Sequence, residues 1–333
     1  MSRYSAAHSN PNGPGDSRPT ALQIIKDEGV EGKLKGKVIV ITGTSSGIGI
    51  ETVRALAATG ATLFLTARSP TKAKTALAGI LEPARMEIVE MDQDSFGSVR
   101  AAANAILEKT DRVNILINNA GIMAVQTLEF TKDGHELQFG TNHLSHFLLF
   151  QLLKPALLAA VTPDFPSRVV NVSSSGHRFH GLNASDNYNF QKGGYGSMVA
   201  YGQSKTANIL MANEIERRYG SQGLHATSLH PGLIDTALSK FLPPGTMSAM
   251  QGEETFSKTM KSPEQGCATT VWAAIGKEWA NKGGKYLDNC AEALPATSDS
   301  DQLAPVYASH IYDEESEARL WKDSIKLVGL DDE

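Results

Sequence analysis

The segment KVIVITGTSSGIG, residues 37–49, constrains the fold of this chain more than any other segment. It begins with a continuous β-branched run, which is typical of a strand buried on both faces. The chain then turns at Gly43, Gly47 and Gly49 and continues into a helical stretch that ends near Thr59. A buried strand followed directly by a helix predicts a βαβ crossover and therefore a parallel sheet.

The same alternation of strand and helix repeats along the chain. Further strands are expected at residues 62–68, 86–92, 113–121, 168–174, 224–232 and 284–289. Helical stretches are expected from residue 70 and at residues 95–109, 134–159 and 198–219. The pattern predicts an α/β fold with one doubly wound domain over residues 36–333, in which helices cover both faces of a seven-stranded, mainly parallel sheet.

Both ends of the chain extend beyond this pattern. Residues 1–35 form an N-terminal extension, whose Pro-, Gly-, Ser- and Asn-rich beginning predicts disorder to about residue 19. A short helix and a turn are expected over residues 20–36. Residues 290–333 form a C-terminal extension of the domain.

Composition excludes several classes of protein. The formal charge of −5 argues against a nucleic-acid-binding protein. We find no apolar run long enough to span a membrane and no secretory signal, so we expect a soluble, cytoplasmic protein. Cys267 and Cys290 are too few for a disulfide framework or a cysteine-based zinc site, and we expect both to be ordinary half-buried residues.

The glycine turn between the first strand and its helix indicates a phosphate site. Glycines permit a tight turn and close approach of the backbone to a pyrophosphate, and the helix N-terminus offers free N–H donors. A glycine-rich turn that binds nothing is the alternative, and the position of the turn favours a dinucleotide cofactor. The candidate residues of this turn are Gly43, Ser45, Ser46, Gly47, Ile48 and Gly49.

The end of the second strand favours NADP(H) over NAD(H). An NAD site usually places a carboxylate there, whereas this chain has Arg68, whose guanidinium suits a 2′-phosphate. An ordinary exposed arginine is the alternative. Asp92 ends the third strand and is a candidate for contact with the adenine amino group, or it caps the helix that follows.

Tyr201 and Lys205 lie four residues apart in a predicted helix and therefore share one face. An ammonium group near a phenol lowers the pKa of the phenol and makes it useful for proton transfer. Such pairs are common on helix surfaces, so the interpretation depends on the surrounding motifs. His143 and His146 are expected to be packing groups, and His177 and His180 to be solvated residues without a metal, because no cysteine or paired carboxylate accompanies them.

Polar or glycine-containing turns follow the first, fourth, fifth and sixth predicted strands, at the sheet edge where ligands of such folds bind. The turn TGTSSGIG at residues 42–49, the motif NNAG at residues 118–121 and the pair Tyr201-x-x-x-Lys205 follow one another in this order. On these motifs the chain resembles the short-chain dehydrogenase/reductase family from Lys37 to its C-terminus, and the resemblance implies a Rossmann fold. It also implies a catalytic tetrad of Asn142, Ser174, Tyr201 and Lys205. Further implied cofactor contacts are Asn119, Ala120 and Gly121, Tyr201 and Lys205, and Pro231, Gly232, Ile234 and Thr236.

Within the family, Arg68 and the closing segment ARLWKDSIKLVGL are similar to the retinol-dehydrogenase-like and fungal branch. Residues 175–200, which separate Ser174 from Tyr201, form a longer insert than compact members have, and we expect it to loop over the site. Residues 237–262 are expected to be a substrate loop that closes over an apolar substrate, with a surface helix pair as the alternative. Relatives often dimerise through the helices that carry Asn142 and Tyr201, so a homodimer is one expectation; the alternative is that the long insert and the C-terminal extension block this face.

The leading hypothesis is an NADPH-dependent carbonyl reductase or alcohol dehydrogenase that acts on an apolar ketone or aldehyde, such as a secondary-metabolite intermediate. In this hypothesis Tyr201 donates the proton, Ser174 polarises the substrate oxygen, and Lys205 and Asn142 support proton transfer. A catalytically silent NADP(H)-sensing or scaffold protein on the same fold is the alternative. A zinc-dependent alcohol dehydrogenase is excluded by the cysteine count.

Overall fold

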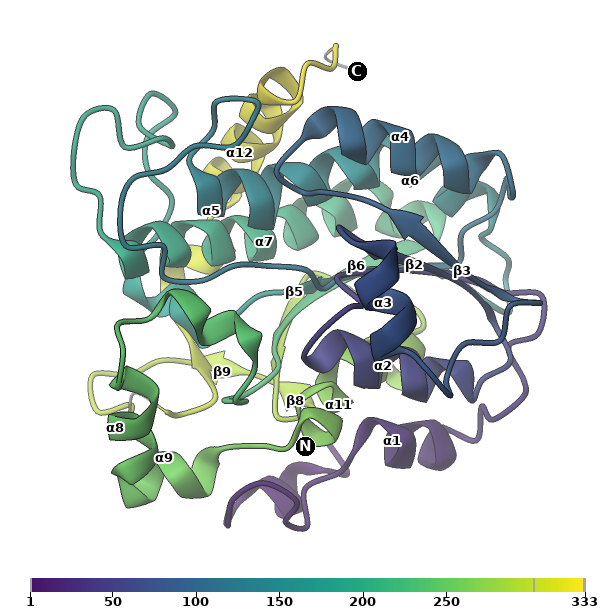
Figure 1. Cartoon of the computed structure of the whole chain (residues 1–333), viewed down its shortest axis with the longest axis horizontal. Coiled ribbons are helices and arrows are strands. Elements are labelled where there is room, and N and C mark those ends of the chain that lie inside the picture. The colour runs from purple at the N-terminus through teal and green to yellow at the C-terminus, as the bar shows by residue number, and fades with distance from the viewer. Residues whose placement is uncertain (1, 302, 332–333) are drawn as a thin grey trace.

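The protein, described by a computed structural model over residues 2–301 and 303–331, consists of a central sheet between two layers of helices (Figure 1). Met1 of the predicted N-terminal extension and residues 302, 332 and 333 of the C-terminal extension lie outside the described residues. Strand and helix alternate as the sequence predicts, and the doubly wound α/β fold is confirmed.

Within the described residues, the main sheet has eight strands in the order β3-β2-β1-β4-β5-β6-β7-β8. The strands are β1 (Val38–Thr42), β2 (Thr62–Ala67), β3 (Met86–Glu90), β4 (Ile115–Asn118), β5 (Ser167–Val172), β6 (Leu224–His230), β7 (Lys285–Asp288) and β8 (Ala291–Glu292). The first seven pair in parallel, and β8 adds an antiparallel edge. The sequence predicts seven strands because a two-residue strand has no periodicity to detect.

The parallel strands are buried on both faces because their side chains alternate between two cores. In β1, Val38 and Val40 contribute to the core under α4, α6 and α7, whereas Ile39 and Ile41 contribute to the core against α1, α2 and α11. All five residues of this strand are buried. The unbroken apolar run of the sequence is therefore explained by a sheet that is covered on both sides.

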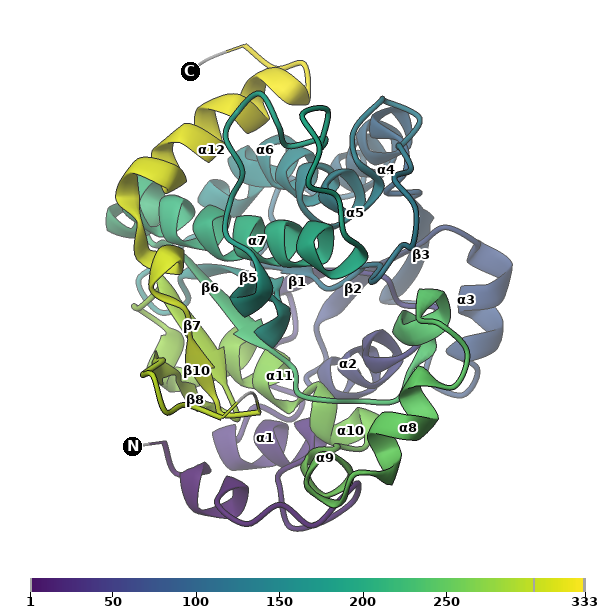
Figure 2. The ribbon, with the colours of Figure 1, turned by 90° about the vertical axis from the view of Figure 1, so that its left-hand side faces the viewer.

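Helices cover the sheet in two layers, which Figure 2 shows edge-on. One layer contains α4 (Phe96–Leu107), α5 (Leu137–Phe139), α6 (Ser145–Ala159), α7 (Ser197–Tyr219) and α12 (Glu314–Leu327). The other contains α1 (Ala21–Glu28), α2 (Ile48–Ala57) and α11 (Ala268–Ile275), with α10 (Pro263–Gly266) beside α2. α3 (Pro70–Ala76) contacts β3, and α8 (Thr246–Gly252) contacts α9 (Glu254–Thr259).

Shorter elements complete the described chain. A second sheet pairs β9 (Leu294–Pro295) with β10 (Val306–Tyr307). The 3₁₀ turns are η1 (Ser5–His8), η3 (Ser175–Phe179), η4 (Gly220–Gln222), η5 (Ala237–Phe241), η6 (Lys277–Trp279) and η7 (Ser309–Tyr312). Among the described residues, none of the helices combines the length and the apolar character needed to cross a membrane. Cys267 and Cys290 are unpaired and fully buried, not half-buried as expected.

The helix expected over residues 134–159 is interrupted. Its first turn, α5, leads into a π-helical turn, η2 (Gly140–Leu144), before α6 begins at Ser145. π-turns leave backbone groups out of the regular α-helical pattern and often occur at functional sites. Apolar periodicity does not reveal such a turn, because one inserted residue shifts the pattern only locally.

The N-terminal extension differs from the predicted disorder. Tyr4 is buried, and the buried Arg18 donates hydrogen bonds to the carbonyl oxygens of Thr259 at 2.7 Å and Gly13 at 3.0 Å. Arg18 also pairs with Asp16 at 2.8 Å. Composition predicted disorder because it reports only the small apolar content of the tail, whereas this ordering comes from polar contacts with a distant segment.

The C-terminal helix α12 packs across α7 and α6. Trp321 is buried with its ring centroid 5.0 Å from that of Phe147, and His143 contacts the hydroxyl of Ser324 at 2.9 Å. Every residue of α7 from Ala200 to Ile215 is buried. This chain's own C-terminal helix therefore covers part of the α6–α7 layer through which dimerisation was predicted, and the homodimer stays a prediction.

Candidate functional site

The glycine turn after β1 is shaped by contacts that only glycine allows. A Cβ on Gly49 would lie 2.2 Å from the carbonyl oxygen of Gly43, and one on Gly43 would lie 2.8 Å from Cα of Ala120. Gly47 has φ +60° and ψ −145°, a conformation that residues with side chains rarely adopt. The start of α2 therefore sits directly against the end of β1 and the turn after β4.

Thr42 joins the two turns. Its hydroxyl accepts hydrogen bonds from the backbone amides of Asn119 and Ala120, both at 2.9 Å. The side-chain amide of Asn119 donates to the carbonyl oxygen of Thr42 at 2.8 Å, while its Oδ1 is buried without a partner among the described residues. The turns after β1 and β4, predicted separately from two motifs, thus form one rigid unit.

This unit fits a dinucleotide phosphate group. The described residues provide no hydrogen-bond acceptor for the backbone amides of Ser45, Ser46 and Gly47, which precede the first residue of α2, Ile48. Free amides at a helix N-terminus attract anions, and the glycines leave room for close approach. The chemistry of this turn therefore matches the group that the sequence predicts.

The ends of β2 and β3 carry Arg68 and Asp92, which the sequence predicts to contact the adenosine side of such a group. Arg68 is exposed directly after β2. Asp92 does not cap α4, because Ser95 is the N-cap residue; instead Asp92 pairs with Lys132 at 2.9 Å. Lys132 lies near enough to Arg68 for their charges to interact, so it adds a second cation that the sequence reasoning missed.

Tyr201 and Ser174 meet at the carboxyl edge of the sheet. Tyr201 is buried in the second turn of α7, and Ser174 caps η3 by accepting from the Gly176 amide at 3.0 Å. A Cβ on Gly176 would lie 2.7 Å from Cε1 of Tyr201, so the turn packs against the phenol ring. Burial raises the pKa of Tyr201 to about 12, although the nearby Ser174 hydroxyl lowers it.

Lys205 lies on the same face of α7 as Tyr201, but its ammonium binds a backbone carbonyl oxygen. Its Nζ donates to the carbonyl oxygen of Val172 at 3.0 Å and lies 5.6 Å from the ring centroid of Tyr201. Burial lowers the pKa of Lys205 to about 8. The structure therefore differs from the prediction that this ammonium lowers the phenol pKa, because burial raises that pKa and the ammonium is bound to a backbone carbonyl.

Asn142 lies in the π-helical turn η2, beside Lys205. Its side chain accepts from the Ile122 amide at 2.8 Å and donates to the Ser204 hydroxyl at 2.9 Å. A Cβ on Gly121 would lie 3.1 Å from Oδ1 of Asn142 and 3.4 Å from Nζ of Lys205, which places these three residues together. His146 binds the Asn142 carbonyl oxygen through Nδ1 at 2.9 Å, so it acts as a packing and capping group.

The segment after β6 folds over the glycine turn. Gly232 adopts φ +108°, and Thr236 caps η5 while its Cβ lies 3.4 Å from the position a Cβ on Gly47 would occupy. The side chain of Ile234 packs against Gly266 and approaches Ile48. Of the predicted clasp residues, Ile234 and Thr236 therefore lie next to the predicted phosphate turn, whereas Gly232 and Pro231 contact the side chain of Lys261.

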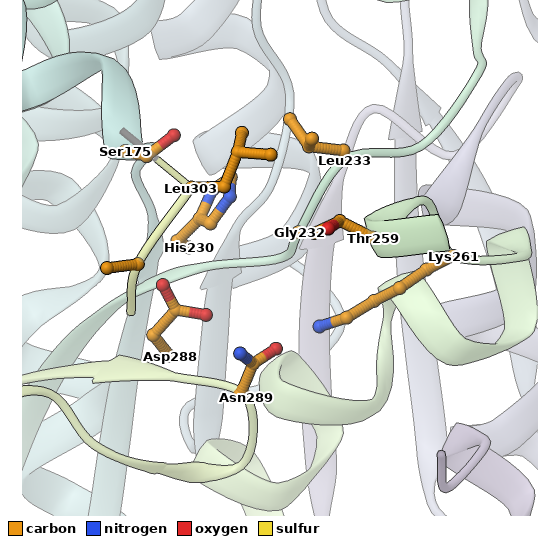
Figure 3. A pocket seen from close by; sticks show the side chains of 10 residues that line it. Ser175, His230, Gly232, Leu233, Thr259, Lys261, Asp288, Asn289 and Leu303 are labelled. Carbon is orange, nitrogen blue, oxygen red and sulfur yellow. The ribbon is translucent and has the colours of Figure 1, made fainter. Parts of the chain in front are cut away.

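A small polar pocket lies beside Ser174, between the ends of β6 and β7 (Figure 3). Ser175, His230, Lys261, Asp288 and Asn289 contribute its polar groups. Sequence reasoning missed these residues, although His230 and Asp288 lie near the ends of predicted strands, at the edge where ligands bind. Lys261 carried no such signal because it lies within the predicted substrate loop.

The insert over residues 175–200 packs mostly against neighbouring helices. The ring of Tyr188 stacks on Phe139 of α5, with centroids 5.1 Å apart, and its hydroxyl contacts Asp323 of α12 at 2.8 Å. Near its end, Tyr195 donates to the carbonyl oxygen of Val125 at 2.7 Å. His177 is buried, not solvated, and accepts from the Ala308 amide at 3.2 Å.

Solved structures share this architecture. An uncharacterized protein from Mycobacterium paratuberculosis is 28% identical, with a TM-score of 0.69, and the match covers 94% of this chain and 98% of that chain. The NADPH-bound carbonyl reductase from chicken fatty liver is 23% identical, with a TM-score of 0.59, and the match covers 78% of this chain and 99% of that one. The second similarity concerns the fold alone.

Proteins with similar sequences identify the family to which the chain belongs. The short-chain dehydrogenase/reductase prx1 of Penicillium roqueforti is 50% identical over 98% of this chain and 95% of its own length. Retinol dehydrogenase 13 of Homo sapiens is 36% identical over 90% of this chain and 86% of its own length. Residues 37–246 match the short chain dehydrogenase family. The predicted resemblance is confirmed, and the chain belongs to the short-chain dehydrogenase/reductase family of oxidoreductases.

Proposed function

We propose that this protein is an NADPH-dependent carbonyl reductase or alcohol dehydrogenase. One observation carries the proposal: Tyr201 is buried at the carboxyl edge of the sheet, where its ring packs against the turn that Ser174 caps, one helical turn from Lys205. A buried phenol beside a hydroxyl is suited to bind and protonate the oxygen of a carbonyl compound.

The residues divide into those that hold the cofactor and those that handle the proton. The glycine turn and the amides of 45–47 would hold the pyrophosphate, and residues 231–236 would hold the nicotinamide end. When bound, NADPH supplies the hydride that reduces the carbonyl carbon. Ser174 orients the carbonyl oxygen by donating a hydrogen bond, and Tyr201 then gives its proton to that oxygen. Lys205 lies one helical turn from Tyr201, where its ammonium would return a proton through a relay water, and Asn142 would hold that water.

The pKa of Tyr201 favours reduction. With a pKa raised to about 12, the phenol carries its proton at neutral pH, which is the state required of a donor. The alkoxide that develops on the substrate is a stronger base than phenolate, so proton transfer from Tyr201 is favourable. Oxidation of an alcohol would instead require the phenolate, which burial disfavours.

NADP(H) is proposed over NAD(H) because of charge at the end of β2. Arg68 is exposed there, and Lys132 lies near it. Two cations suit a 2′-phosphate, whereas an NAD site usually has a carboxylate at this position. We expect Arg68→Ala to raise the Kd of NADPH about 10-fold or more, since charged hydrogen bonds contribute roughly 1.5–3 kcal/mol, and to leave the Kd of NADH unchanged in equilibrium titrations.

An apolar ketone or aldehyde is the proposed substrate. The segment at residues 237–262 contains η5, α8 and α9, which contact few other elements, and Leu238 and Met250 are exposed on it. A segment of short helices with exposed apolar side chains is suited to close over an apolar substrate. The relationship to a protein named retinol dehydrogenase 13 supports the same class.

Single-turnover loss of NADPH absorbance with a panel of ketones tests the proposal. We expect Tyr201→Phe to slow this step by about 10²–10⁴-fold, the usual contribution of a general acid. Tyr219→Phe is the matched control, since Tyr219 is the last residue of the same helix. Equal rates for the wild type and Tyr201→Phe on every ketone would overturn the proposal and favour the silent scaffold.

A further inference from the structure

We propose that the polar pocket between β6 and β7 is a subsite for a second oxygen function of the substrate, a hydroxyl group close to the reacting carbonyl. The inference rests on the proposed reductase function and adds the class of substrate, a hydroxylated ketone. It follows from the location of the pocket, the unmet hydrogen bonds in it and its electrostatic balance.

The pocket is next to the proposed reaction centre. Ser175 lines it and directly follows Ser174, so its Cα lies only about 3.8 Å from that of Ser174. Gly232 and Leu233, from the segment proposed to clasp the nicotinamide, form another wall. A group attached within a few bonds of a carbonyl at Ser174 is therefore near enough to enter the pocket.

Three polar side chains face the same space (Figure 3). His230 and Asp288 are paired in register on neighbouring parallel strands, so their side chains leave the same face of the sheet. Lys261 reaches the pocket from the other side, after α9. All three are buried, with exposed fractions of 8% for His230, 5% for Asp288 and 3% for Lys261.

These side chains have fewer partners than their burial requires. Nδ1 of His230 is buried without a partner among the described residues. The ammonium of Lys261 can donate three hydrogen bonds. Among the described residues it makes one long bond, to the carbonyl oxygen of Pro231 at 3.3 Å. Burial raises the pKa of Asp288 to about 7, although Lys261, the Asn289 amide and Arg178 lower it, and burial lowers the pKa of Lys261.

A hydroxyl group suits this environment better than a charged group. A carboxylate would be attracted by Lys261 but repelled by Asp288, and an ammonium would meet the opposite problem. A hydroxyl can accept from Lys261 and donate to Asp288 or His230 at the same time. The pocket encloses about 30 Å³, enough for a group of this size, because a site needs about 10–15 Å³ to hold a water.

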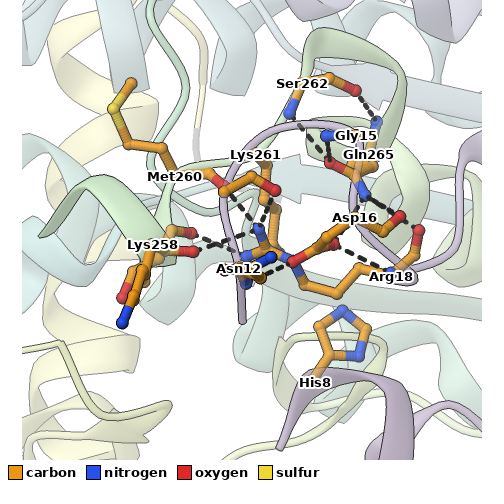
Figure 4. A network of polar contacts seen from close by, with 12 residues as sticks. His8, Asn12, Gly15, Asp16, Arg18, Lys258, Met260, Lys261, Ser262 and Gln265 are labelled. Atoms are coloured by element: carbon orange, nitrogen blue, oxygen red, sulfur yellow. Dashed lines mark hydrogen bonds and ion pairs between the residues drawn. The ribbon is translucent and has the colours of Figure 1, made fainter. Parts of the chain in front are cut away.

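The N-terminal extension holds Lys261 in place (Figure 4). Arg18 donates to the carbonyl oxygens of Met260 at 2.5 Å and Thr259 at 2.7 Å, immediately before Lys261. The backbone amide of Lys261 donates to the carbonyl oxygen of Leu233 at 2.8 Å. The backbone at Lys261 is thus held by contacts on both sides, which restricts where its side chain can reach, as a specificity group requires.

Competing ketones of equal size test the subsite. We expect the wild type with NADPH to reduce 3-hydroxycyclohexanone with a kcat/KM about 10-fold or more above that for 3-methylcyclohexanone, because the methyl analogue leaves buried polar groups unpaired. Lys261→Met keeps most of the apolar stem that packs on Gly232 and removes the ammonium. We expect it to bring the ratio close to one through loss of activity on the hydroxyl compound.

Lys258→Met is the matched control, because Lys258 lies on the same segment with its side chain half exposed and paired with Glu254. It should keep the preference of the wild type. If Lys261→Met does not fold, His230→Phe provides the second variant, since it keeps a ring and removes both nitrogens. Binding of cyclohexane-1,3-diol and 3-methylcyclohexanol to the full chain with NADPH gives a readout without turnover, because neither partner can oxidise the other, and the diol should bind more tightly.

The outcomes separate the two proposals. Activity that depends on Tyr201 but shows no preference for the hydroxyl compound overturns the subsite and leaves the reductase intact. A preference that persists in Lys261→Met and in His230→Phe also overturns the subsite. Failure to reduce any ketone, with wild type and Tyr201→Phe alike, overturns the proposed function and the subsite with it.

Discussion

The sheet region at residues 37–246 and the shell formed by the two ends of the chain are held in place by different kinds of contact. In the sheet region the critical contacts are close approaches of backbone around the glycine turn, such as Gly49 against Gly43 and Gly43 against Ala120. In the shell they join side chains to distant segments, as Arg18 binds residues 258–260 and Trp321 packs on Phe147. Changes in the first region should therefore affect cofactor binding, and changes in the second should affect stability and local order.

The largest effect is expected for Trp321→Ala in the shell. Its ring packs against Phe147 and Phe150, and Arg218 lies 4.7 Å from its centroid. Loss of a buried tryptophan should lower the free energy of unfolding by about 3–5 kcal/mol. Chemical denaturation measures this change, with exposed Lys322→Ala as the control on the same helix. A large loss of NADPH affinity in the folded variant would erase the contrast between the two regions.

Gly49→Ala should produce the opposite pattern. The added Cβ would meet the carbonyl oxygen of Gly43 and push α2 away from the turn, so we expect the Kd of NADPH to rise about 100-fold, or roughly 2.7 kcal/mol. Gly97→Ala is the control, since a Cβ there meets only Oγ of Ser95 at 3.6 Å. Fluorescence titration with NADPH gives both constants, and an unchanged Kd in Gly49→Ala would contradict the predicted phosphate site.

Arg18→Met tests whether the N-terminal extension acts on one segment or on the whole fold. The substitution leaves several buried carbonyl oxygens without a donor, and we expect a loss of about 2–3 kcal/mol of stability. Proteolysis should quicken within residues 237–262 before the rest of the chain is cut. Arg3→Met should lose less than Arg18→Met, because the Arg3 side chain is half exposed and its buried partner Glu28 also accepts from the Lys277 amide. Uniform cleavage along the chain would argue against a local role.

The smallest effect concerns pH. Since burial lowers the pKa of Lys205 to about 8, its ammonium is lost as the pH rises through that value. If the charge supports proton return to Tyr201, kcat/KM for reduction should be level below pH 8 and fall up to about tenfold per pH unit above it. Lys205→Arg should move the fall of kcat/KM to higher pH, because arginine stays protonated. A profile of the wild type that stays flat to pH 10 would exclude the role of the charge.

Much of the sheet and of the cofactor site could be predicted from the sequence because its evidence is local. The β-branched run of β1 reports burial on both faces, and the glycines report backbone contacts a few residues apart. The break in the helix at Asn142, the two-residue strand β8 and the ordered N-terminal extension were missed, since none of them has a periodicity or a composition that marks it.

The sequence by itself determined the parallel α/β sheet, the glycine turn after β1 and the four-residue spacing that sets Tyr201 and Lys205 on one face of α7. Only the tertiary structure decided that the Lys205 ammonium binds the Val172 carbonyl and that burial raises the pKa of Tyr201. It alone brought Lys261 opposite His230 and Asp288. The reason is physical: strand, turn and helix depend on neighbours along the chain, whereas pKa values and pockets depend on which distant groups replace water around a side chain.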